Sequence, residues 1–266
     1  MTDFGSRGVY PGVLHAVAVG AGCRAPIVDL THDVPPYDVA VASFLLTITH
    51  PFLPAGSVVA AVVDPGVGSD RRGIIVQSHD RWIVAPDNGL ARETVEDDPG
   101  ARAWALDPGR VQSTFPEELA RRSASTFDGR DLFVPAAVAL LLGAAPGALG
   151  DPIESIAGTR DAAAISESSD ALNAPGRWID PFGNILTAVT VDRVARFGAG
   201  KPLHATVAGH DLGEVVEHYV ARPGGTLTAL ANSWGRIEVA CTEGNAASVL
   251  GVRNARDVLL SLRRTP

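Results

Sequence analysis

The chain has 266 residues, of which 46% are hydrophobic and 20% charged, an ordinary balance for a globular protein with ample core material. Its formal net charge of −8 argues against a nucleic-acid-binding protein, which usually presents a basic face, and leaves room for a cationic small ligand. The two cysteines, Cys23 and Cys241, lie far apart in sequence and favour a reducing compartment, so we expect a cytoplasmic protein.

No membrane association is expected. Met1 is followed at once by Thr2 and Asp3, which does not resemble a signal peptide. The longest apolar runs, 57–63 and 134–145, are too short to cross a bilayer.

Strand-like and helix-like stretches alternate in the first half of the chain. Helices are predicted at 9–22, 37–49 and 132–142, and strands at 26–30, 57–63, 74–77 and 81–85. The run 57–63 (SVVAAVV) is nearly continuous and β-branched, which is typical of a strand covered on both faces. His79 and Asp80 separate the last two strands of a predicted pair. This alternation predicts a sheet covered by helices.

The second half has a different pattern. Residues 153–176 are rich in Ala, Ser, Asp and Gly with weak periodicity, so we interpret them as a linker. Short strands separated by turn residues are then predicted at 178–191, 203–207, 227–230, 236–242 and 258–262. The predicted organisation is an N-terminal domain (1–152), the linker, and a small β-rich C-terminal domain (177–266).

The beginning of the chain is unusual. Residues 2–5 (TDFG) read as a loop that would normally follow a strand, yet only Met1 precedes them. Losing a central strand would expose a sheet edge. We therefore expect a truncated start.

Seven short blocks occur in order along the chain: TDFG (2–5), VDLTHDVPPYD (28–38), VVDPGVGSDRR (62–72), APDNG (85–89), STFDGRDLFVPAA (125–137), IDPFGN (179–184), and NSWGRIEVA followed by NAA (232–247). Any one block is weak evidence. Together they resemble the family of S-adenosyl-L-methionine (SAM) hydrolases and halogenases, over almost the whole chain.

The resemblance implies a fold and an activity. The expected fold is an N-terminal α/β/α sandwich domain joined to a smaller C-terminal β-barrel-like domain. The expected assembly is a homotrimer whose active sites lie between the N-terminal domain of one subunit and the C-terminal domain of its neighbour. The expected reaction is attack of water on the ribose C5′ of SAM, giving adenosine and methionine without a cofactor.

Three residues are the expected catalytic group. In the hydrolases an Asp, an Arg and a His handle the water; Asp64 and Arg71 match the first two, but the usual TFHGRD block has Asp128 in place of His. Two carboxylates then flank one guanidinium, and since like charges at close range raise one pKa, one carboxylate is a candidate base. The alternative is a broken triad in a protein that binds SAM or adenosine with little turnover. Arg72 is expected to be a solvated surface charge.

The remaining matches are expected to bind substrate. In the N-terminal domain Asp3 matches the carboxylate that grips the ribose hydroxyls, or else forms a local turn with Gly5. Tyr37 matches an aromatic residue that packs on the ligand, with ordinary surface packing as the alternative.

The C-terminal matches are Asp180 for the methionine ammonium, Asn184 for adenine, Tyr219 for packing on adenine, Ser233 for the methionine carboxylate, and the backbone near Ala246 for adenine. Phe182 is expected to lie in the core.

Two other kinds of site have weaker support. A halogenase is disfavoured because the Asp64 carboxylate would repel a halide, although Gly129 leaves room beside a halide site. The seven histidines show no metal-ligand spacing such as HExxH, so the spacing predicts no metal site.

Overall fold

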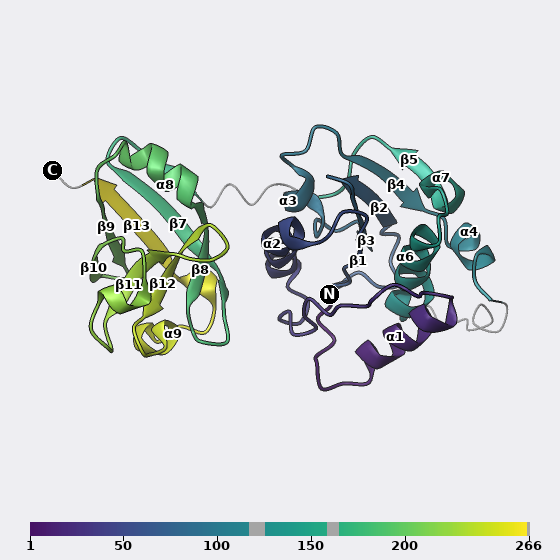
Figure 1. Ribbon diagram of the computed structural model, residues 1–266, viewed down its shortest axis with the longest axis horizontal. Helices are drawn as coiled ribbons and strands as arrows, with labels where there is room; N and C mark the ends of the chain where they lie inside the picture. Colours follow the sequence, from purple (N-terminus) through teal and green to yellow (C-terminus); the bar gives the residue numbers. More distant parts are fainter. Residues whose placement is uncertain (117–125, 159–164, 265–266) are drawn as a thin grey trace. The chain divides into compact units, whose positions relative to one another are not determined.

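The computed structural model describes residues 1–116, 126–158 and 165–264 (Figure 1). The chain divides into two compact units, Met1–Arg160 and Asp161–Pro266, and each is described separately below. The division falls inside the predicted linker, of which 159–164 lie outside the described residues, as does Ser125 of the block 125–137. No helix in the described part of the chain is both long and apolar enough to span a membrane.

Unit 1 is built on a five-stranded sheet in the order β1-β3-β2-β4-β5. Its strands are β1 (Val58–Ala60), β2 (Gly73–Ser78), β3 (Arg81–Pro86), β4 (Arg102–Leu106) and β5 (Gly150–Ile153). Its helices are α1 (Tyr10–Gly20), α2 (Val39–Thr49), α3 (Arg92–Val95), α4 (Pro108–Ser113), α6 (Val134–Leu141) and α7 (Pro146–Leu149). β1 pairs with β3 in parallel, and the other neighbours are antiparallel.

The sheet of unit 1 is covered on both faces, as the alternation predicted. Figure 1 shows α2 and α3 on one face and α4, α6 and α7 on the other. Ile75 of β2 and Val84 of β3 belong to one buried cluster with Phe133, which precedes α6, and Ala136 of α6. The predicted hairpin is confirmed: β2 and β3 are antiparallel, and both turn residues, His79 and Asp80, have positive φ angles of 45° and 59°. Positive φ at both positions is typical of a two-residue hairpin turn.

The predicted strand at 26–30 is wrong. No strand forms there, and Val28 is 73% exposed. The N-terminal segment of the chain forms one β-bridge instead, in which Thr2 pairs in parallel with Val62. Thr2 also bonds to the segment after residue 30. Its N–H donates to the Thr31 carbonyl at 3.0 Å, and its carbonyl accepts the Val34 N–H at 3.4 Å. Apolar composition predicted a buried strand, but a strand also needs a ladder partner, and none of the described residues provides one for 26–30.

Unit 2 is a curved sheet in the order β10-β9-β13-β7-β8-β12-β11, with β6 also paired to β7. Its strands are β6 (Ser166–Glu167), β7 (Ala171–Ile179), β8 (Ile185–Thr190), β9 (Leu203–Val207), β10 (His210–Glu214), β11 (Leu227–Ala231), β12 (Arg236–Cys241) and β13 (Leu259–Arg264). Its helices are α8 (Val191–Gly198) and α9 (Ala246–Leu250).

The two edges of this sheet approach each other. Val216, which follows β10, donates its N–H to the Ala229 carbonyl of β11 at 2.9 Å. This contact brings the first and last strands of the order together and gives the unit the expected barrel-like form. Its interior is a single apolar cluster that includes Leu172, Ile185 and Val239.

The predicted linker extends too far. Residues 171–176, assigned to it, form the first part of β7, a central strand that pairs with β13. Leu172, Ala174 and Gly176 are buried there at alternate positions. Such small residues carry a weak hydrophobic signal, so composition alone indicated a linker.

Candidate active site

Asp64 follows β1 by four residues, at the carboxyl end of that strand. Its Oδ1 accepts the Gly66 N–H at 3.2 Å, so it caps the turn that leads into the loop 64–72. The same oxygen accepts Arg71 Nε–H at 2.9 Å, and Oδ2 forms an ion pair with Arg71 Nη2. The turn therefore fixes the carboxylate and the guanidinium together.

Asp128 approaches the same guanidinium from a different element. It precedes a π-helical turn, Gly129–Phe133, that continues directly into α6. Single π turns inside helices are frequent at functional sites because they reorient side chains. Here the turn starts next to Asp128, whose Oδ2 accepts a hydrogen bond from Arg71 Nη2.

The three expected catalytic residues therefore form one contiguous group. Their side chains are 6% (Asp64), 12% (Arg71) and 23% (Asp128) exposed. Burial alone would lower the pKa of Arg71, but the hydrogen bonds and charges of Asp64 and Asp128 outweigh it and raise that pKa above its ordinary value. Arg71 is a permanent cation between two acids, and the trio has a formal charge of −1 when both are ionised.

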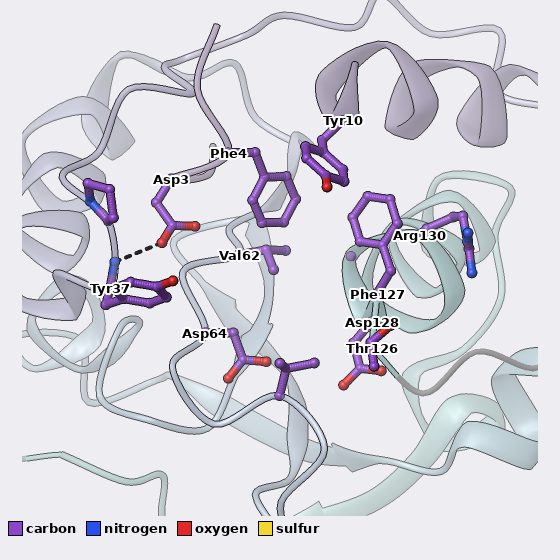
Figure 2. A pocket seen from close by; sticks show the side chains of 13 residues that line it. Asp3, Phe4, Tyr10, Tyr37, Val62, Asp64, Thr126, Phe127, Asp128 and Arg130 are labelled. Carbon is purple, nitrogen blue, oxygen red and sulfur yellow. Dashed lines mark hydrogen bonds between the residues drawn. The ribbon is translucent and has the colours of Figure 1, made fainter. Parts of the chain in front are cut away.

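A pocket of about 610 Å³ opens beside this group, entirely within unit 1. Figure 2 shows Asp64 and Asp128 among its lining residues, together with an aromatic wall of Phe4, Tyr10 and Phe127. The three rings pack with centroids 5.4 to 5.8 Å apart. Besides its ion pair with Arg71, the buried Asp64 Oδ2 has no hydrogen-bond donor among the described residues. A water molecule in the pocket is the kind of donor that would satisfy it.

Asp3 and Tyr37 line the same pocket (Figure 2). The Asp3 carboxylate accepts the Tyr37 N–H at 2.8 Å and does not make the local turn with Gly5, whose N–H bonds to the His32 carbonyl at 2.7 Å. Tyr37 has a φ of 66°, uncommon for a residue with a large side chain, and its side chain is exposed at the pocket. The Asp3 carboxylate thus holds Tyr37 in that conformation.

In unit 2 the structure brings Asp180 and Asn184 together in the turn between β7 and β8. Asp180 Oδ1 accepts the N–H groups of Phe182 and Asn184 at 2.9 and 2.8 Å, and Oδ2 accepts Asn184 Nδ2–H at 3.0 Å. Phe182 is 76% exposed at the tip of this turn, so its predicted core position is wrong. The turn bonds fix its backbone and direct its ring away from the barrel interior.

Tyr219 belongs to a second polar group of unit 2. Its hydroxyl donates to Glu238 Oε1, and Glu238 Oε2 accepts Asn232 Nδ2–H at 2.9 Å. Burial raises the pKa of Tyr219, and the hydrogen bond to Glu238 and the charges of Glu238 and Asp180 raise it further. Burial also raises the pKa of Glu238, although its hydrogen bonds with Tyr219 and Asn232 oppose this. Glu238 is only 2% exposed.

The last two predicted residues, Ser233 and Ala246, lie in different parts of unit 2. Ser233 is exposed in the turn between β11 and β12, and the side chain of Asn232 holds that turn by accepting the N–H groups of Trp234 and Arg236. Ala246 is fully buried at the first position of α9, directly after the N-cap Asn245.

Arg72 is exposed, as expected of a surface charge, with 46% of its side chain accessible, but it is also paired with a buried acid. Its Nε–H donates to Asp87 Oδ2 at 3.0 Å, and the Asp87 side chain is 3% exposed. Asp87 Oδ1 also accepts the Ala157 N–H at 2.6 Å. Adjacent arginines look equivalent in sequence, but the strand β2 begins immediately afterwards and directs Arg71 and Arg72 to different acids.

Sequence reasoning missed several residues of these sites. Phe4, Tyr10 and Phe127 form the pocket wall, although nothing in their spacing indicated that they meet. Glu238 had a usable signal, because it is a lone acid inside the otherwise apolar strand 237–241. An ionisable residue in a buried strand is expected to have a specific partner.

Comparison with known protein families also divides the chain into an N-terminal and a C-terminal part. Residues 1–150 match the model of the SAM hydroxide adenosyltransferase N-terminal domain, and residues 177–259 match that of the SAM hydroxide adenosyltransferase C-terminal domain. An (R)-S-adenosyl-L-methionine hydrolase of Thermus thermophilus is 35% identical, over 98% of this chain and 97% of that protein. An enzyme of the same name from Salinispora arenicola is 34% identical, over 94% and 92%.

Solved structures share the fold. An uncharacterized conserved protein from Thermotoga maritima superposes with a TM-score of 0.86 at 27% identity, covering 99% of this chain and 98% of that one. A conserved hypothetical protein from Thermus thermophilus gives 0.75 at 32% identity, covering 100% and 97%.

Proposed function

Because this chain belongs to the SAM hydroxide adenosyltransferase family, we propose that it hydrolyses SAM to adenosine and L-methionine. The similar enzymes from Thermus and Salinispora are named for (R)-SAM. Since "L" already specifies the amino-acid carbon, "(R)" refers to the sulfonium centre. We propose the (R)-sulfonium epimer as the substrate.

The observation that carries this proposal is that Asp64 and Asp128, which share the Arg71 guanidinium, both line one pocket. The leaving group is neutral methionine, which departs with the electron pair of the C5′–S bond. The water oxygen forms the new bond to C5′, and one proton passes to a base and then to solvent. Holding water and carbon in line can contribute ~7–11 kcal/mol.

We assign the water to the oxygens of Asp64 and Asp128, with one of the two as the base. A base of this kind contributes roughly 10²- to 10⁴-fold to the rate. Arg71 orients both carboxylates. The formal charge of −1 suits a sulfonium substrate and opposes a halide.

We assign Asp3 to the ribose hydroxyls and Tyr37 to packing on the nucleoside, since both line the pocket that contains the catalytic group. We assign the unit 2 residues to the two ends of the substrate. Asp180 binds the methionine ammonium and Ser233 the methionine carboxylate. Adenine is bound by Asn184, Tyr219 and the backbone at Ala246. The chemistry proposed uses neither a metal nor a cofactor.

We propose that the enzyme is a cytoplasmic homotrimer in which unit 2 of a neighbouring subunit completes each pocket. The support is that the lining of the described pocket comes from unit 1 alone. Unit 2 exposes a set of large apolar side chains near its assigned substrate residues, and such surfaces mark interaction sites. They are Phe182, Tyr219, Val220 and Trp234. The two buried, free cysteines fit a reducing compartment.

The test is to incubate the full chain with each sulfonium epimer and to follow adenosine and methionine by chromatography. We expect equal amounts of both products, faster release from the (R) epimer, and loss of at least ~10²-fold in Asp64→Asn. Asp70→Asn, an exposed residue of the same loop, is the matched control and should retain the natural rate.

The competing functions give different results. A SAM-binding protein would bind substrate without releasing adenosine. A halogenase would form a 5′-halogenated nucleoside when chloride or fluoride is added. Either outcome would replace hydrolysis as the function.

A further inference from the structure

Two histidines and an aspartate converge on the side of unit 1 where α1 meets the segment 29–32. His15 Nε2 lies 2.8 Å from Asp29 Oδ1, and His32 Nε2 lies 3.0 Å from the same oxygen. All three ligand atoms lie within 4.8 Å of one another. Among the described residues this is the only group of three or more His, Cys, Asp or Glu side chains with such geometry.

His32 has the environment of a fixed ligand. Its side chain is 8% exposed, and its other ring nitrogen, Nδ1, lies 2.8 Å from Thr2 Oγ1. A hydrogen bond at the second nitrogen is what orients metal-binding histidines. Binding of an ion would replace the Nε2 protons that now donate to Asp29 Oδ1, and each proton would move to the other ring nitrogen or to solvent. Thr2 is itself fixed, since it is 1% exposed and its Oγ1 also accepts the Phe4 N–H at 3.1 Å.

The other two side chains are open to solvent. His15 and Asp29 are 40% and 45% exposed, so an ion has a path to the group and a water molecule has space as a further ligand. Burial would raise the pKa of Asp29, but hydrogen bonds from His32 and His15 outweigh it and lower that pKa. The carboxylate is therefore ionised at neutral pH, as a metal ligand must be.

We propose that His15, Asp29 and His32 form a binding site for a divalent ion of the zinc type, with water as the fourth ligand. Two imidazoles and one carboxylate are a common zinc ligand set. Zinc bonds to these atoms are ~2.0–2.1 Å long, so two ligand atoms of one ion are at most ~4.2 Å apart. The present ligand atoms lie within 4.8 Å of one another, close to that spacing, and His15, whose side chain is 40% exposed, is the imidazole with space to adjust.

The ion would connect segments that hold one side of the pocket. His15 belongs to α1, whose first residue, Tyr10, is part of the aromatic wall. The His32 carbonyl accepts the Gly5 N–H at 2.7 Å, and Thr2 precedes the pocket residue Asp3. The ion stabilises this side of unit 1 and takes no part in the reaction. The inference is independent of the proposed hydrolysis.

Spacing could not predict this site because its ligands come from separate segments. His15 is on a helix, whereas Asp29 and His32 lie in an extended stretch without a strand. The simpler alternative is a hydrogen-bonded His–Asp–His group that binds no ion, and titration with metal distinguishes the two.

The experiment uses the purified full chain after treatment with a chelator. Zn²⁺ is titrated by calorimetry, and Co²⁺ is added separately, because tetrahedral Co²⁺ has intense visible absorption. We expect saturable binding of one equivalent, the tetrahedral Co²⁺ spectrum, and a higher Tm with Zn²⁺. His15→Gln and Asp29→Asn should each abolish all three effects while retaining the circular dichroism of the natural chain.

His204→Gln is the matched control. His204 has the same 40% side-chain exposure as His15 and also pairs with an aspartate, its Nε2 lying 2.7 Å from Asp211 Oδ1, but the described residues supply no third ligand beside them. This variant should bind Zn²⁺ like the natural chain. Absence of equimolar binding in the natural chain, or equal binding by His15→Gln, would overturn the proposal and leave a hydrogen-bonded group.

Discussion

At the residue scale, Arg71 is held by two acids and an aromatic ring. Its guanidinium contacts Asp64 and Asp128 and lies 5.2 Å from the centroid of Phe133. Removing one partner of a buried ionic group leaves the others uncompensated, which typically costs ~3–5 kcal/mol. The three residues therefore act as a unit, and a change at one position alters the position and charge of the other two.

In the proposed reaction, the residue at position 128 helps to accept the proton of the attacking water. Asp128→Asn keeps an acceptor for Arg71 but removes the charge, so we expect kcat to fall by ~10²-fold or more. Asp128→His should retain turnover but acquire a loss of rate below about pH 6.5, where an ordinary imidazole is protonated and cannot act as base. The natural enzyme should lack that loss.

Measuring kcat against pH for the three proteins checks this expectation. Arg72, which binds Asp87 outside the pocket, provides the control, because Arg72→Lys should keep the natural pH profile. Identical rates and profiles in all variants would place residue 128 outside the chemistry.

The proposed catalytic residues were predictable as a group, and their surroundings were not. Asp64, Arg71 and Asp128 lie in local sequence blocks, so a match to the family located them, and the structure brings them together. The wall of Phe4, Tyr10 and Phe127 results from packing between segments over 110 residues apart along the chain. Local pattern carries no information about such contacts.

At the scale of elements, the turn 180–184 supports α9. Gly183 has a φ of 87°, and a Cβ added there would lie 2.1 Å from Asn245 Cγ, the N-cap side chain of α9. Its carbonyl also accepts the Ala247 N–H at 3.0 Å. Gly183→Ala should therefore displace the helix N-terminus at Ala246 and destabilise unit 2 by more than the ~1–3 kcal/mol of backbone strain alone.

Gly225→Ala is the control that separates backbone strain from the clash with Asn245. Gly225 also has a positive φ, 76°, but no described atom lies within 4 Å of an added Cβ. Chemical denaturation should show a larger loss for Gly183→Ala, together with a higher KM for SAM. Equal losses in the two variants would mean that contact with Asn245 contributes nothing.

His50 at the end of α2 makes the stability of unit 1 depend on pH. It is 3% exposed, its Nε2 has no described partner, and burial, aided by the charges of Arg81 and His79, lowers its pKa to about 4. The folded state thus disfavours protonated His50 relative to the unfolded chain. The contribution of neutral His50 to the free energy of unfolding is fully present above about pH 6.5. It is lost as the pH falls towards 4, and the complete loss is roughly 3 kcal/mol.

Denaturation midpoints at about pH 7 and about pH 5 test this effect. We expect His50→Leu to reduce the loss of stability on acidification, because it removes the titrating ring and fills similar space. His79→Asn replaces an exposed histidine of positive φ and should leave most of the loss in place. If His50→Leu keeps the full acid sensitivity, other groups cause it.

Elements with a strong local signal were predicted closely. The hairpin around His79 and Asp80, the helix α2 and the strand β9 all formed where the pattern placed them. The first part of β7 was missed because small residues hide its alternation, and 26–30 was overpredicted because ladder partners are not visible in a local pattern. Both errors concern tertiary context and not propensity.

At the scale of the whole molecule, the proposed substrate residues are divided between two units. Asp3 and the catalytic group belong to unit 1, whereas Asp180 and Tyr219 belong to unit 2. A trimer in which neighbouring subunits share each site predicts that defects in the two units complement each other. Asp64→Asn should inactivate a unit 1 half-site, and Asp180→Asn, which keeps Oδ1 as an acceptor for the turn, should weaken a unit 2 half-site.

Co-expression of the two variants with different affinity tags, followed by purification through both tags, isolates mixed oligomers. If each site combines unit 1 of one subunit with unit 2 of the next, every mixed trimer contains one site with both natural halves, so about a third of the sites in the purified sample are natural. Activity in the mixed sample should therefore exceed that of either variant alone. A double variant, Asp64→Asn with Asp180→Asn, co-expressed with Asp64→Asn should stay inactive. Sites formed within single chains would give no recovery in either mixture, because every chain then carries a defect in its own site.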